Sequence, residues 1–461
     1  MAIVKGYTLP HPPLAVPGVG RGKEMGISTT LAAMDVVACE IAEIAPDCII
    51  YITPHSILYS DHFHVSPGGS AVGDLGRFGC PDIRFEAVYD DELVREISGI
   101  AEHNGISAGT QGEREAGLDH GVTVPMWFIN KRYTNYKSVR VSQSGMASTE
   151  HYMLGQVIRK AVEATGRRAV VIASSDLSHK LLEDAPYGFS GEGPMFDGLV
   201  TDALKTGDFL SLFKIPGDIR ERAAECGYNS LMILAGCFDK QKVDVDLMSY
   251  EGPFGVGYAV ASFSPVAGVE VESVLELYVE HALKESDIKR KAEDDYQSLA
   301  RQSLEYIIKT GKELSVPTGL PDEMMKNRAG VFVSLHKNGK LRGCIGTIAP
   351  TADCVASEII QNAISAGLSD NRFDPVSVEE LPYLVYKVDV LSPPEPISGP
   401  EFLDVKRYGV IVKSGFKRGL LLPNLDGVDT VSEQIGIASN KAGIRAGDDI
   451  SLERFEVVRH G

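Results

Sequence analysis

The sequence is poor in the features that mark secreted or membrane-inserted chains. Its seven cysteines are scattered over 461 residues and are odd in number, which argues against a disulfide framework and favours a reducing compartment. No run of about 20 apolar residues occurs, so we expect no membrane span. The N-terminal segment MAIVKGYTLPHPPL lacks the long apolar core of a signal peptide. These absences predict a cytoplasmic protein.

Positive charge is also scarce. The chain has 45 Lys and Arg residues against 63 Asp and Glu residues, which gives a formal net charge of -18. Because such an acidic surface repels phosphate backbones, we do not expect nucleic acid as a partner. The hydrophobic share of 44% and the charged share of 23% are ordinary for a globular protein, and the length suggests about two or three domains.

The first 265 residues alternate short apolar runs with segments of helical spacing. The expected strands are 2–7, 47–53, 137–143 and 167–175, and the expected helices are 24–44, 150–164 and 220–238. Continuous β-branched runs that alternate with helices are typical of an α/β domain with a mostly parallel sheet covered by helices on both faces. In such folds the loops after the strands carry the chemistry.

The pattern changes near residue 268. A long charged helical region covers about 271–311, and the remaining chain shows two hairpin candidates, 330–348, turning at Asn338-Gly339, and 408–423. We therefore expect an α/β domain at 1–268, a helical connector at 269–287 and an α+β domain at 288–461.

Four histidines of the first domain follow strands or sit in sharp loops. His11 and His55 come directly after the first two expected strands, His179 follows the run VVIASS, and His120 lies in GLDHGV. Neighbouring prolines stiffen the backbone around His11 and His55. Strand ends on one edge of a parallel sheet meet at one crevice. The sequence therefore predicts a metal site built from histidines. The remaining histidines of the domain, by contrast, are expected to be solvated or packed (His62, His64) or on the surface (His103, His151).

Two imidazoles need a third donor to complete a typical site. The segment AAECGYNSLM offers Glu225 and Cys226 where a helix is expected to begin. Two histidines and a carboxylate form the facial triad of non-haem Fe(II) oxygenases. A first-turn glutamate that complements the helix dipole is the alternative for Glu225.

Together these motifs resemble the class III extradiol dioxygenase family, that of the catalytic B subunit of protocatechuate 4,5-dioxygenase. The resemblance covers about residues 1–265 and rests on HPP (11–13), TPHS (53–56), GLDHG (117–121), SSDLSH (174–179) and AECGYNS (224–230). It implies a non-haem Fe(II) enzyme that cleaves a catechol-like aromatic diol with O₂.

The resemblance also assigns roles. It implies that His11, His55 and Glu225 bind iron, that His179 is the catalytic acid and base, and that His120 lines the substrate and oxygen pocket. A histidine has an ordinary pKa of about 6.5 and so can take a proton near pH 7. Asp176 and Asp119 lie close in sequence to His179 and His120 and are expected to orient them.

The same fold family includes the Memo proteins, which use a Cys-Gly pair near the equivalent helix start. Here Cys226 precedes Gly227, so Cys226 is the alternative third ligand, and a thiolate there favours Zn or Cu. We favour Glu225 over Cys226. The alternative function is a non-catalytic, Memo-like metal-binding or interaction protein.

The C-terminal region resembles the AMMECR1 family over about residues 288–461, with the signature LRGCIGT at 341–347. Arg342, Gly343 and Cys344 form its candidate site, because an arginine beside a cysteine favours the thiolate. A tight strand path with Cys344 packed as a small apolar side chain is the alternative. The fusion resembles a component of the AmmeMemoRadiSam system, which implies a radical SAM partner.

Substrate recognition and assembly are less marked in the sequence. Arg21, Lys23 and Arg140 are candidates for meeting a substrate carboxylate, although surface charge is the simpler interpretation. Relatives with this fold often pair, so we expect a homo-oligomer.

Overall fold

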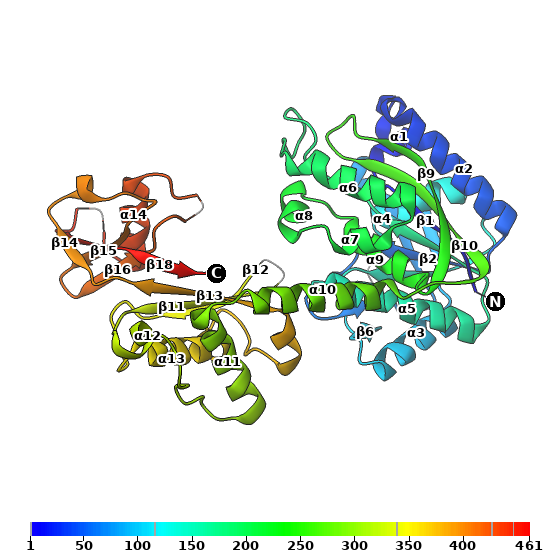
Figure 1. Cartoon of the computed structure of the whole chain (residues 1–461). Helices are drawn as coiled ribbons and strands as arrows, with labels where there is room; N and C mark the ends of the chain where they lie inside the picture. The colour runs from blue at the N-terminus through cyan, green and yellow to red at the C-terminus, as the bar shows by residue number, and fades with distance from the viewer. Residues whose placement is uncertain (1, 115–116, 338–339, 426, 446) are drawn as a thin grey trace. The chain divides into compact units, whose positions relative to one another are not determined.

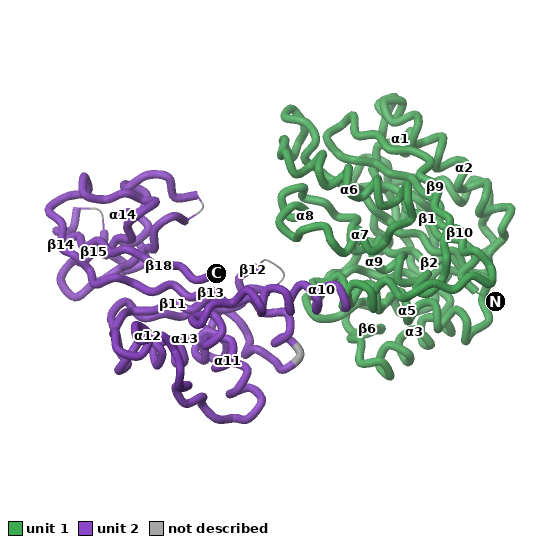
Figure 2. The backbone as a smooth tube through the Cα atoms, viewed as in Figure 1, with its two compact units in different colours: residues 1–279 green, residues 280–461 purple. Residues whose placement is uncertain are grey.

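The computed structural model describes residues 2–114, 117–337, 340–425, 427–445 and 447–461. The chain divides into two compact units, residues 1–279 and 280–461 (Figure 2). The expected turn at Asn338-Gly339 lies outside the described residues.

Unit 1 is built on a six-stranded mixed sheet with the order β7-β2-β8-β1-β10-β9. Figure 1 labels its strands β1, β2, β9 and β10. Its strands are β1 (Ile3–Leu9), β2 (Cys48–Thr53), β7 (Lys137–Ser142), β8 (Ala169–Ser174), β9 (Gln241–Glu251) and β10 (Tyr258–Glu270). The strands β7, β2, β8 and β1 run parallel, whereas β10 pairs antiparallel with both β1 and β9. The expectation of a mostly parallel sheet is therefore only partly correct, because the antiparallel strands β10 and β9 form one side of the sheet.

Helices lie against both faces of this sheet. Alternate residues of β2 point into different cores: Ile50 and Ile52 pack in one apolar cluster, and Ile49 and Tyr51 pack in another. The helices of unit 1 include α1 (Pro17–Gly20), α2 (Ser28–Ile44), α3 (Asp91–His103), α4 (His120–Ile129), α5 (Ser148–Thr165), α6 (Glu192–Thr206), α7 (Phe209–Phe213), α8 (Gly217–Ala223) and α9 (Tyr228–Cys237). Residues of α3, α5 and α9 contribute to the first cluster, and residues of α2 and α4 contribute to the second. Burial on both sides explains why β2 reads as a continuous apolar run.

Further short elements of unit 1 lie outside the six-stranded sheet. They are the parallel pair β3 (Phe63–His64) and β6 (Ala108–Gly109), the hairpin β4 (Ser70–Leu75) and β5 (Cys80–Val88), and the 3-10 turns η1 (Pro13–Ala15), η2 (Lys23–Ile27) and η3 (Gly76–Phe78). The turn η1 follows His11 in the chain, and the Phe78 ring of η3 meets the His120 ring edge-on.

The helical stretch Lys23–Ile44, formed by η2 and α2, passes by length and composition as a possible membrane-crossing helix. Met34, Val37 and Ile41 of this stretch are fully or almost fully buried against the second apolar cluster. The buried core helix of a globular domain passes the same test of length and apolar content.

Unit 2 contains two four-stranded sheets. The first has the order β12-β11-β13-β18 and packs against the helices α11 and α13, whereas the second has the order β14-β17-β15-β16 and packs against α14. The strands are β11 (Val331–Lys337), β12 (Lys340–Gly346), β13 (Leu384–Leu391), β14 (Glu395–Ile397), β15 (Gly409–Ser414), β16 (Lys417–Leu421), β17 (Ser451–Phe455) and β18 (Val457–His460). The helices and turns are α11 (Asp295–Thr310), α12 (Asp322–Lys326), α13 (Val355–Leu368), α14 (Val431–Lys441), η4 (Val378–Tyr383) and η5 (Pro400–Phe402). The expected hairpin at 408–423 is present as β15 and β16.

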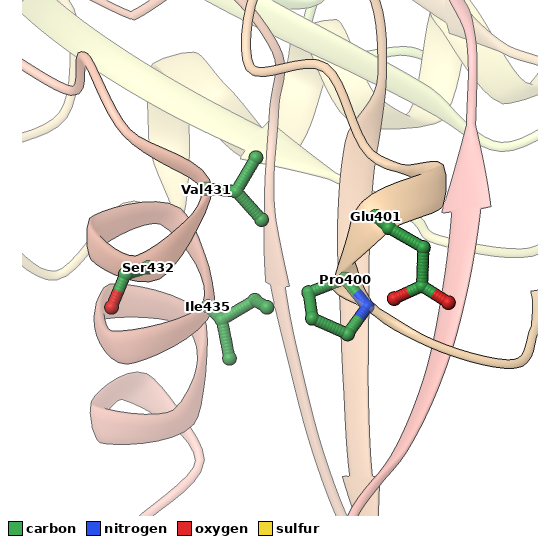
Figure 3. A pocket seen from close by; sticks show the side chains of 5 residues that line it. All are labelled: Pro400, Glu401, Val431, Ser432 and Ile435. Carbon is green, nitrogen blue, oxygen red and sulfur yellow. The ribbon is translucent and has the colours of Figure 1, made fainter.

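The helix α10 (Val274–Lys291) contains the boundary between the two units. The charged helical region expected at 271–311 is therefore two helices, because the Asp294 carboxylate caps the start of α11. In unit 2, an open groove of about 480 Å³ lies between η5 and α14 and is lined by Pro400, Glu401, Val431, Ser432 and Ile435 (Figure 3).

Candidate metal centre

The candidate site lies at the carboxyl ends of the parallel strands of unit 1. His11 follows β1, His55 follows β2 and His179 follows β8, while His120 is the first residue of α4. Pro12 holds an extended conformation at the start of η1 and so fixes the chain directly after His11. The structure thus brings together the four histidines that the sequence singles out.

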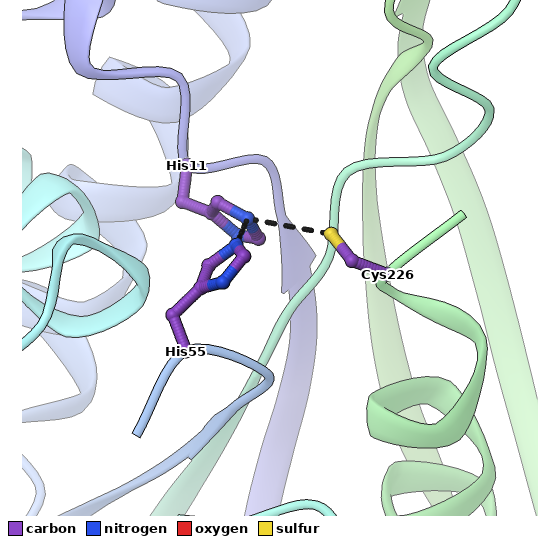
Figure 4. A group of neighbouring side chains, drawn as sticks. All are labelled: His11, His55 and Cys226. Atoms are coloured by element: carbon purple, nitrogen blue, oxygen red, sulfur yellow. Dashed lines mark hydrogen bonds between the residues drawn. The ribbon is translucent and has the colours of Figure 1, made fainter. Parts of the chain in front are cut away.

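The donor atoms of three side chains converge on one point (Figure 4). His11 Nε2 lies 3.0 Å from His55 Nε2 and 3.6 Å from Cys226 Sγ, and the three donor atoms all lie within 4.8 Å of one another. Metal–nitrogen and metal–sulfur bonds of about 2.0 to 2.3 Å place two ligands of one ion roughly 3 to 4 Å apart. The separations from His11 therefore fit one transition-metal ion.

Glu225 does not join this group of donor atoms. Its carboxylate accepts a hydrogen bond of 2.7 Å from the backbone N–H of Tyr228, the first residue of α9. This is the helix-capping arrangement that the sequence left open for Glu225. The preference for Glu225 over Cys226 is thus not matched by the geometry, because Cys226 and not Glu225 faces the two imidazoles.

A break between two helices determines where Cys226 points. The structure has two helices, α8 and α9, where the sequence predicted one helix at 220–238. Ala224 lies between them and has a φ of +52°. Gly227 then passes so close to the end of β8 that a Cβ there would lie 2.3 Å from Ser175 Cβ and 2.6 Å from the carbonyl oxygen of Asp176. Only glycine allows this approach, which carries Cys226 to the histidines.

Hydrogen bonds fix the ring of His11 and the backbone of Cys226. His11 Nδ1 lies 2.9 Å from the Ser174 hydroxyl, so its Nε2 is the atom that faces the other donors. The carbonyl oxygen of Cys226 accepts a hydrogen bond of 2.9 Å from Gln143 Nε2. Partners of this kind orient metal-binding side chains. Ser174 is the last residue of β8 and belongs to the SSDLSH motif. Its role in orienting the His11 ring could therefore have been predicted from the sequence.

His120 and His179 lie beside the donor group. The His120 ring stacks on that of His55 with centroids 4.1 Å apart and meets the His11 ring edge-on at 5.4 Å. His179 Nδ1 lies 2.6 Å from the carbonyl oxygen of Ala224. Because a carbonyl oxygen can only accept, Nδ1 of His179 carries a proton and Nε2 of the neutral ring keeps its lone pair.

Burial keeps these imidazoles neutral. It lowers the pKa of His11 well below the ordinary value, and the positive forms of His55 and His120 act in the same direction. Burial lowers the pKa of His55 and that of His120 to about 4, and the nearby Arg77 adds to the effect on His120. Burial also lowers the pKa of His179. All four rings are therefore uncharged at neutral pH and available as ligands or proton acceptors.

The acidic groups near the site have other partners than the sequence suggested. Asp176 does not orient His179: its Oδ1 accepts a hydrogen bond of 2.8 Å from the backbone N–H of His11, and its burial raises its pKa to about 7. Asp119 accepts a hydrogen bond of 2.6 Å from the Thr53 hydroxyl at the end of β2. Both carboxylates thus tie the loops of different strands together.

The other polar candidates of the first domain lie elsewhere. His64 is buried and its Nε2 bonds to the backbone carbonyl of Glu113. The expectation that His151 is on the surface is wrong, because it is fully buried in α5 with its ring bonded to the Ala147 carbonyl oxygen. Arg140 is buried in β7, where it donates to the Ser66 hydroxyl, so it does not reach a substrate as a surface charge.

The C-terminal signature lies on β12. The Arg342 guanidinium is held by Glu380 in two hydrogen bonds of 2.9 and 3.0 Å. A Cβ on Gly343 would lie 2.1 Å from the carbonyl oxygen of Ala366 in α13. Cys344 accepts a hydrogen bond of 3.2 Å from the Ser334 hydroxyl. The glycine thus serves close packing, and the arginine is already neutralised by a carboxylate.

Comparison with known proteins gives this architecture a family. Residues 5–261 match the family described as the catalytic LigB subunit of aromatic ring-opening dioxygenase, which is more than half of the chain. The chain belongs to this family. Residues 297–460 match the AMMECR1 family, so the chain is a fusion of a LigB domain with an AMMECR1 domain.

Relatives share this arrangement in whole or in part. Protein CA_C1420 of Clostridium acetobutylicum is 41% identical over 463 residues, which is 98% of this chain and 98% of that protein. A protein of Thermotoga maritima is 50% identical over 170 residues, 36% of this chain and 98% of its own length. The crystal structure of uncharacterized protein PH0010 from Pyrococcus horikoshii is 35% identical and covers 36% of this chain and 88% of that chain, with a TM-score of 0.33.

Proposed function

We propose that the LigB domain binds one metal ion through His11, His55 and Cys226 and acts as an extradiol-type dioxygenase on a small catechol-like aromatic diol with O₂. The observation that supports this most directly is the convergence of two imidazoles and a thiol beside two further neutral imidazoles, His120 and His179. A plain metal-storage site has no need of proton-accepting side chains next to its ligands.

The bound metal would supply a Lewis acid that lowers the pKa of a coordinated hydroxyl. Around it, His179 is the proton acceptor, because the Ala224 carbonyl holds its Nδ1–H and leaves Nε2 free to take a proton from the diol. Burial lowers the pKa of His179, which favours return of the proton later in the reaction. The stacked ring of His120 shields the His55 side of the site and offers a second hydrogen-bonding group.

The nature of the third donor governs which metal is bound. Fe(II) is the expectation from the family, whereas a thiolate from Cys226 adds affinity for softer ions such as Zn or Cu. Burial, with the nearby Asp176 and Glu225 carboxylates, raises the pKa of the Cys226 thiol, so metal binding must displace its proton. Cys226 is also the observation that favours the second candidate function, a Memo-like metal-binding protein without ring cleavage that acts with a radical SAM partner.

Oxygen consumption separates the two functions. The full chain is loaded with Fe(II) without oxygen, and O₂ uptake is then followed with a panel of catechols. The proposal predicts uptake with at least one vicinal diol and a loss of about 100-fold in His179→Gln, the usual order for a positioned acid or base. His103→Gln, an exposed histidine at the end of α3, is the matched control. Iron binding without turnover of any diol favours the second function.

A further inference from the structure

Asp197 is a buried carboxyl of α6 that contacts the loop carrying His179. The residue is 1% exposed. Its Oδ1 accepts a hydrogen bond of 2.8 Å from the backbone N–H of Ser178, and its Oδ2 accepts one of 2.7 Å from the hydroxyl of Tyr250 in β9. Asp197 therefore links three segments, which are α6, β9 and the loop that follows β8.

The same loop is also bonded to the end of α8. The Ser178 hydroxyl and the His179 N–H both donate to the carbonyl oxygen of Ala223, at 3.1 and 3.0 Å. The next carbonyl oxygen, that of Ala224, holds the protonated Nδ1 of His179 at 2.6 Å. The position of the His179 ring thus depends on how the loop is held by α6 and by the end of α8.

The surrounding chain makes room for a carboxylate at this point. A Cβ on Gly257 would lie 2.0 Å from Asp197 Oδ2, so the segment directly before β10 comes this close only because it has no side chain there. Burial of a carboxyl costs free energy unless hydrogen bonds compensate for it, whereas an apolar side chain in α6 would fill space without that cost. The specific contribution of the carboxyl is therefore the direction in which it holds the Ser178 N–H.

We propose that Asp197, held in place by Tyr250, is the positioning residue of His179. Through the Ser178 N–H it fixes the loop so that the Nδ1–H of His179 reaches the Ala224 carbonyl and Nε2 is left as the proton acceptor. The proposal rests on the proposed function, in which His179 takes a proton from the diol. The hydrogen bond at one ring nitrogen determines which nitrogen carries the proton. A displaced loop therefore lets the proton move to Nε2, where the ring can no longer accept one.

A positioning role and a purely structural role of Asp197 have different consequences. If Asp197 only stabilises the fold, its loss lowers the free energy of unfolding and leaves the His179 ring as it is. If it positions the loop, its loss changes the tautomer of His179. It then also lowers kcat more than it changes KM, because the proton acceptor acts in the chemical step and not in binding of the diol.

Nitrogen NMR of the Zn-loaded full chain with ¹⁵N-labelled histidine rings reads the tautomer of His179, and the spectrum of His179→Gln identifies its signals. In the wild type we expect a protonated Nδ1 and an unprotonated Nε2, and in Asp197→Ala a mixture of the two tautomers. Asp197→Asn is expected to keep the wild-type tautomer, because its amide oxygen can accept from the Ser178 N–H and its amide nitrogen can donate to the Tyr250 oxygen.

Tyr250→Phe is the second variant, and it decides the question if Asp197→Ala does not fold. Tyr250 is 41% exposed, and this substitution removes only the hydroxyl that orients the carboxyl. It is expected to give part of the change in tautomer. If Asp197→Ala does not fold and Tyr250→Phe has the wild-type spectrum, the proposal is overturned.

Thr201→Val is the matched control, because Thr201 is also buried in α6 and its hydroxyl donates to backbone carbonyl oxygens of the same helix. It is expected to keep the wild-type spectrum. A wild-type spectrum in folded Asp197→Ala, or an equal change in Thr201→Val, would overturn the proposal.

Oxygen uptake by the Fe(II)-loaded variants separates the two proposals. With a diol that is turned over, we expect kcat to fall about tenfold in Asp197→Ala and to stay within about twofold of the wild type in Asp197→Asn. A wild-type kcat in Asp197→Ala would contradict the positioning role. If no diol is turned over, the proposed function fails, and the NMR comparison still decides whether Asp197 positions His179.

Discussion

Glu225 and Cys226 are neighbours in the chain, yet their side chains serve different parts of the fold. The carboxylate of Glu225 caps α9, and the thiol of Cys226 faces His11. The direction of each depends on the positive φ of Ala224, a conformation that an alanine adopts only when tertiary packing imposes it. No pattern in the sequence signals such a position. The histidines were easier to predict, because each follows a recognisable strand or loop motif.

At the same scale, Asp197 gives the protein a defined pH dependence. Asp197 is buried in α6, accepts hydrogen bonds from the Ser178 N–H and the Tyr250 hydroxyl, and has its pKa raised by burial to about 7. A carboxyl that holds its proton more tightly when folded contributes stability at low pH, and that contribution is lost as the pH rises through about 7.

Urea denaturation of the wild type and of Asp197→Asn between pH 5 and pH 8 measures this effect. The stability of the wild type relative to Asp197→Asn is expected to fall with rising pH, by at most about 1.4 kcal/mol for each pH unit. In the asparagine variant the amide oxygen can still accept from the Ser178 N–H, the amide nitrogen can donate to the Tyr250 oxygen, and no titratable group is left there. A relative stability that is constant or that rises with pH would show that Asp197 is already ionised in the fold.

Among the elements, the break between α8 and α9 positions the candidate metal centre. The periodicity of residues 220–238 predicted one helix, because the apolar spacing continues across the break. The structure has two helices, with Gly227 packed against the end of β8. The spacing of apolar residues does not reveal that the end of β8 passes close to Gly227, because this is a tertiary contact.

Gly227→Ala is expected to disrupt this contact. The added methyl group would lie 2.3 Å from Ser175 Cβ, so we expect a loss of about 1–3 kcal/mol in the free energy of unfolding and a weaker metal affinity, because Cys226 is displaced. Gly198→Ala in α6 has open space around the new methyl group and is expected to stabilise the protein by about 0.5–1 kcal/mol. Equal effects of the two substitutions on stability and metal content would refute this account of Gly227.

For the whole molecule, the sequence predicted the fusion of a LigB-like domain with an AMMECR1-like domain but only part of the sheet. The buried parallel strands are visible as continuous apolar runs, whereas the antiparallel pairing of β10 with β1 depends on where the chain returns after α9. The burial of His151 likewise depends on the packing of α5 against Phe63, whose ring it meets edge-on at 4.7 Å. Composition and spacing carry no information about such long-range contacts.

The division of the chain into two units predicts how it responds to metal. All residues of the candidate metal centre lie within residues 1–279. A ligand that binds only the folded form stabilises the unit that holds it. Scanning calorimetry of the full chain is therefore expected to show one transition that moves to higher temperature with Zn and one that does not move. Cys226→Ala assigns the first, because its Zn-dependent shift is expected to shrink. A uniform shift of all transitions would contradict the assignment.

X-ray absorption at the metal edge of the Zn-loaded full chain tests most directly which side chains hold the ion. The account predicts nitrogen ligands at about 2.0–2.1 Å and one sulfur ligand at about 2.3 Å. The sulfur signal is lost in Cys226→Ala, whereas Glu225→Gln leaves the spectrum unchanged. A shell of nitrogen and oxygen only, which is insensitive to Cys226→Ala and altered by Glu225→Gln, would contradict the central claim that His11, His55 and Cys226 form the metal centre.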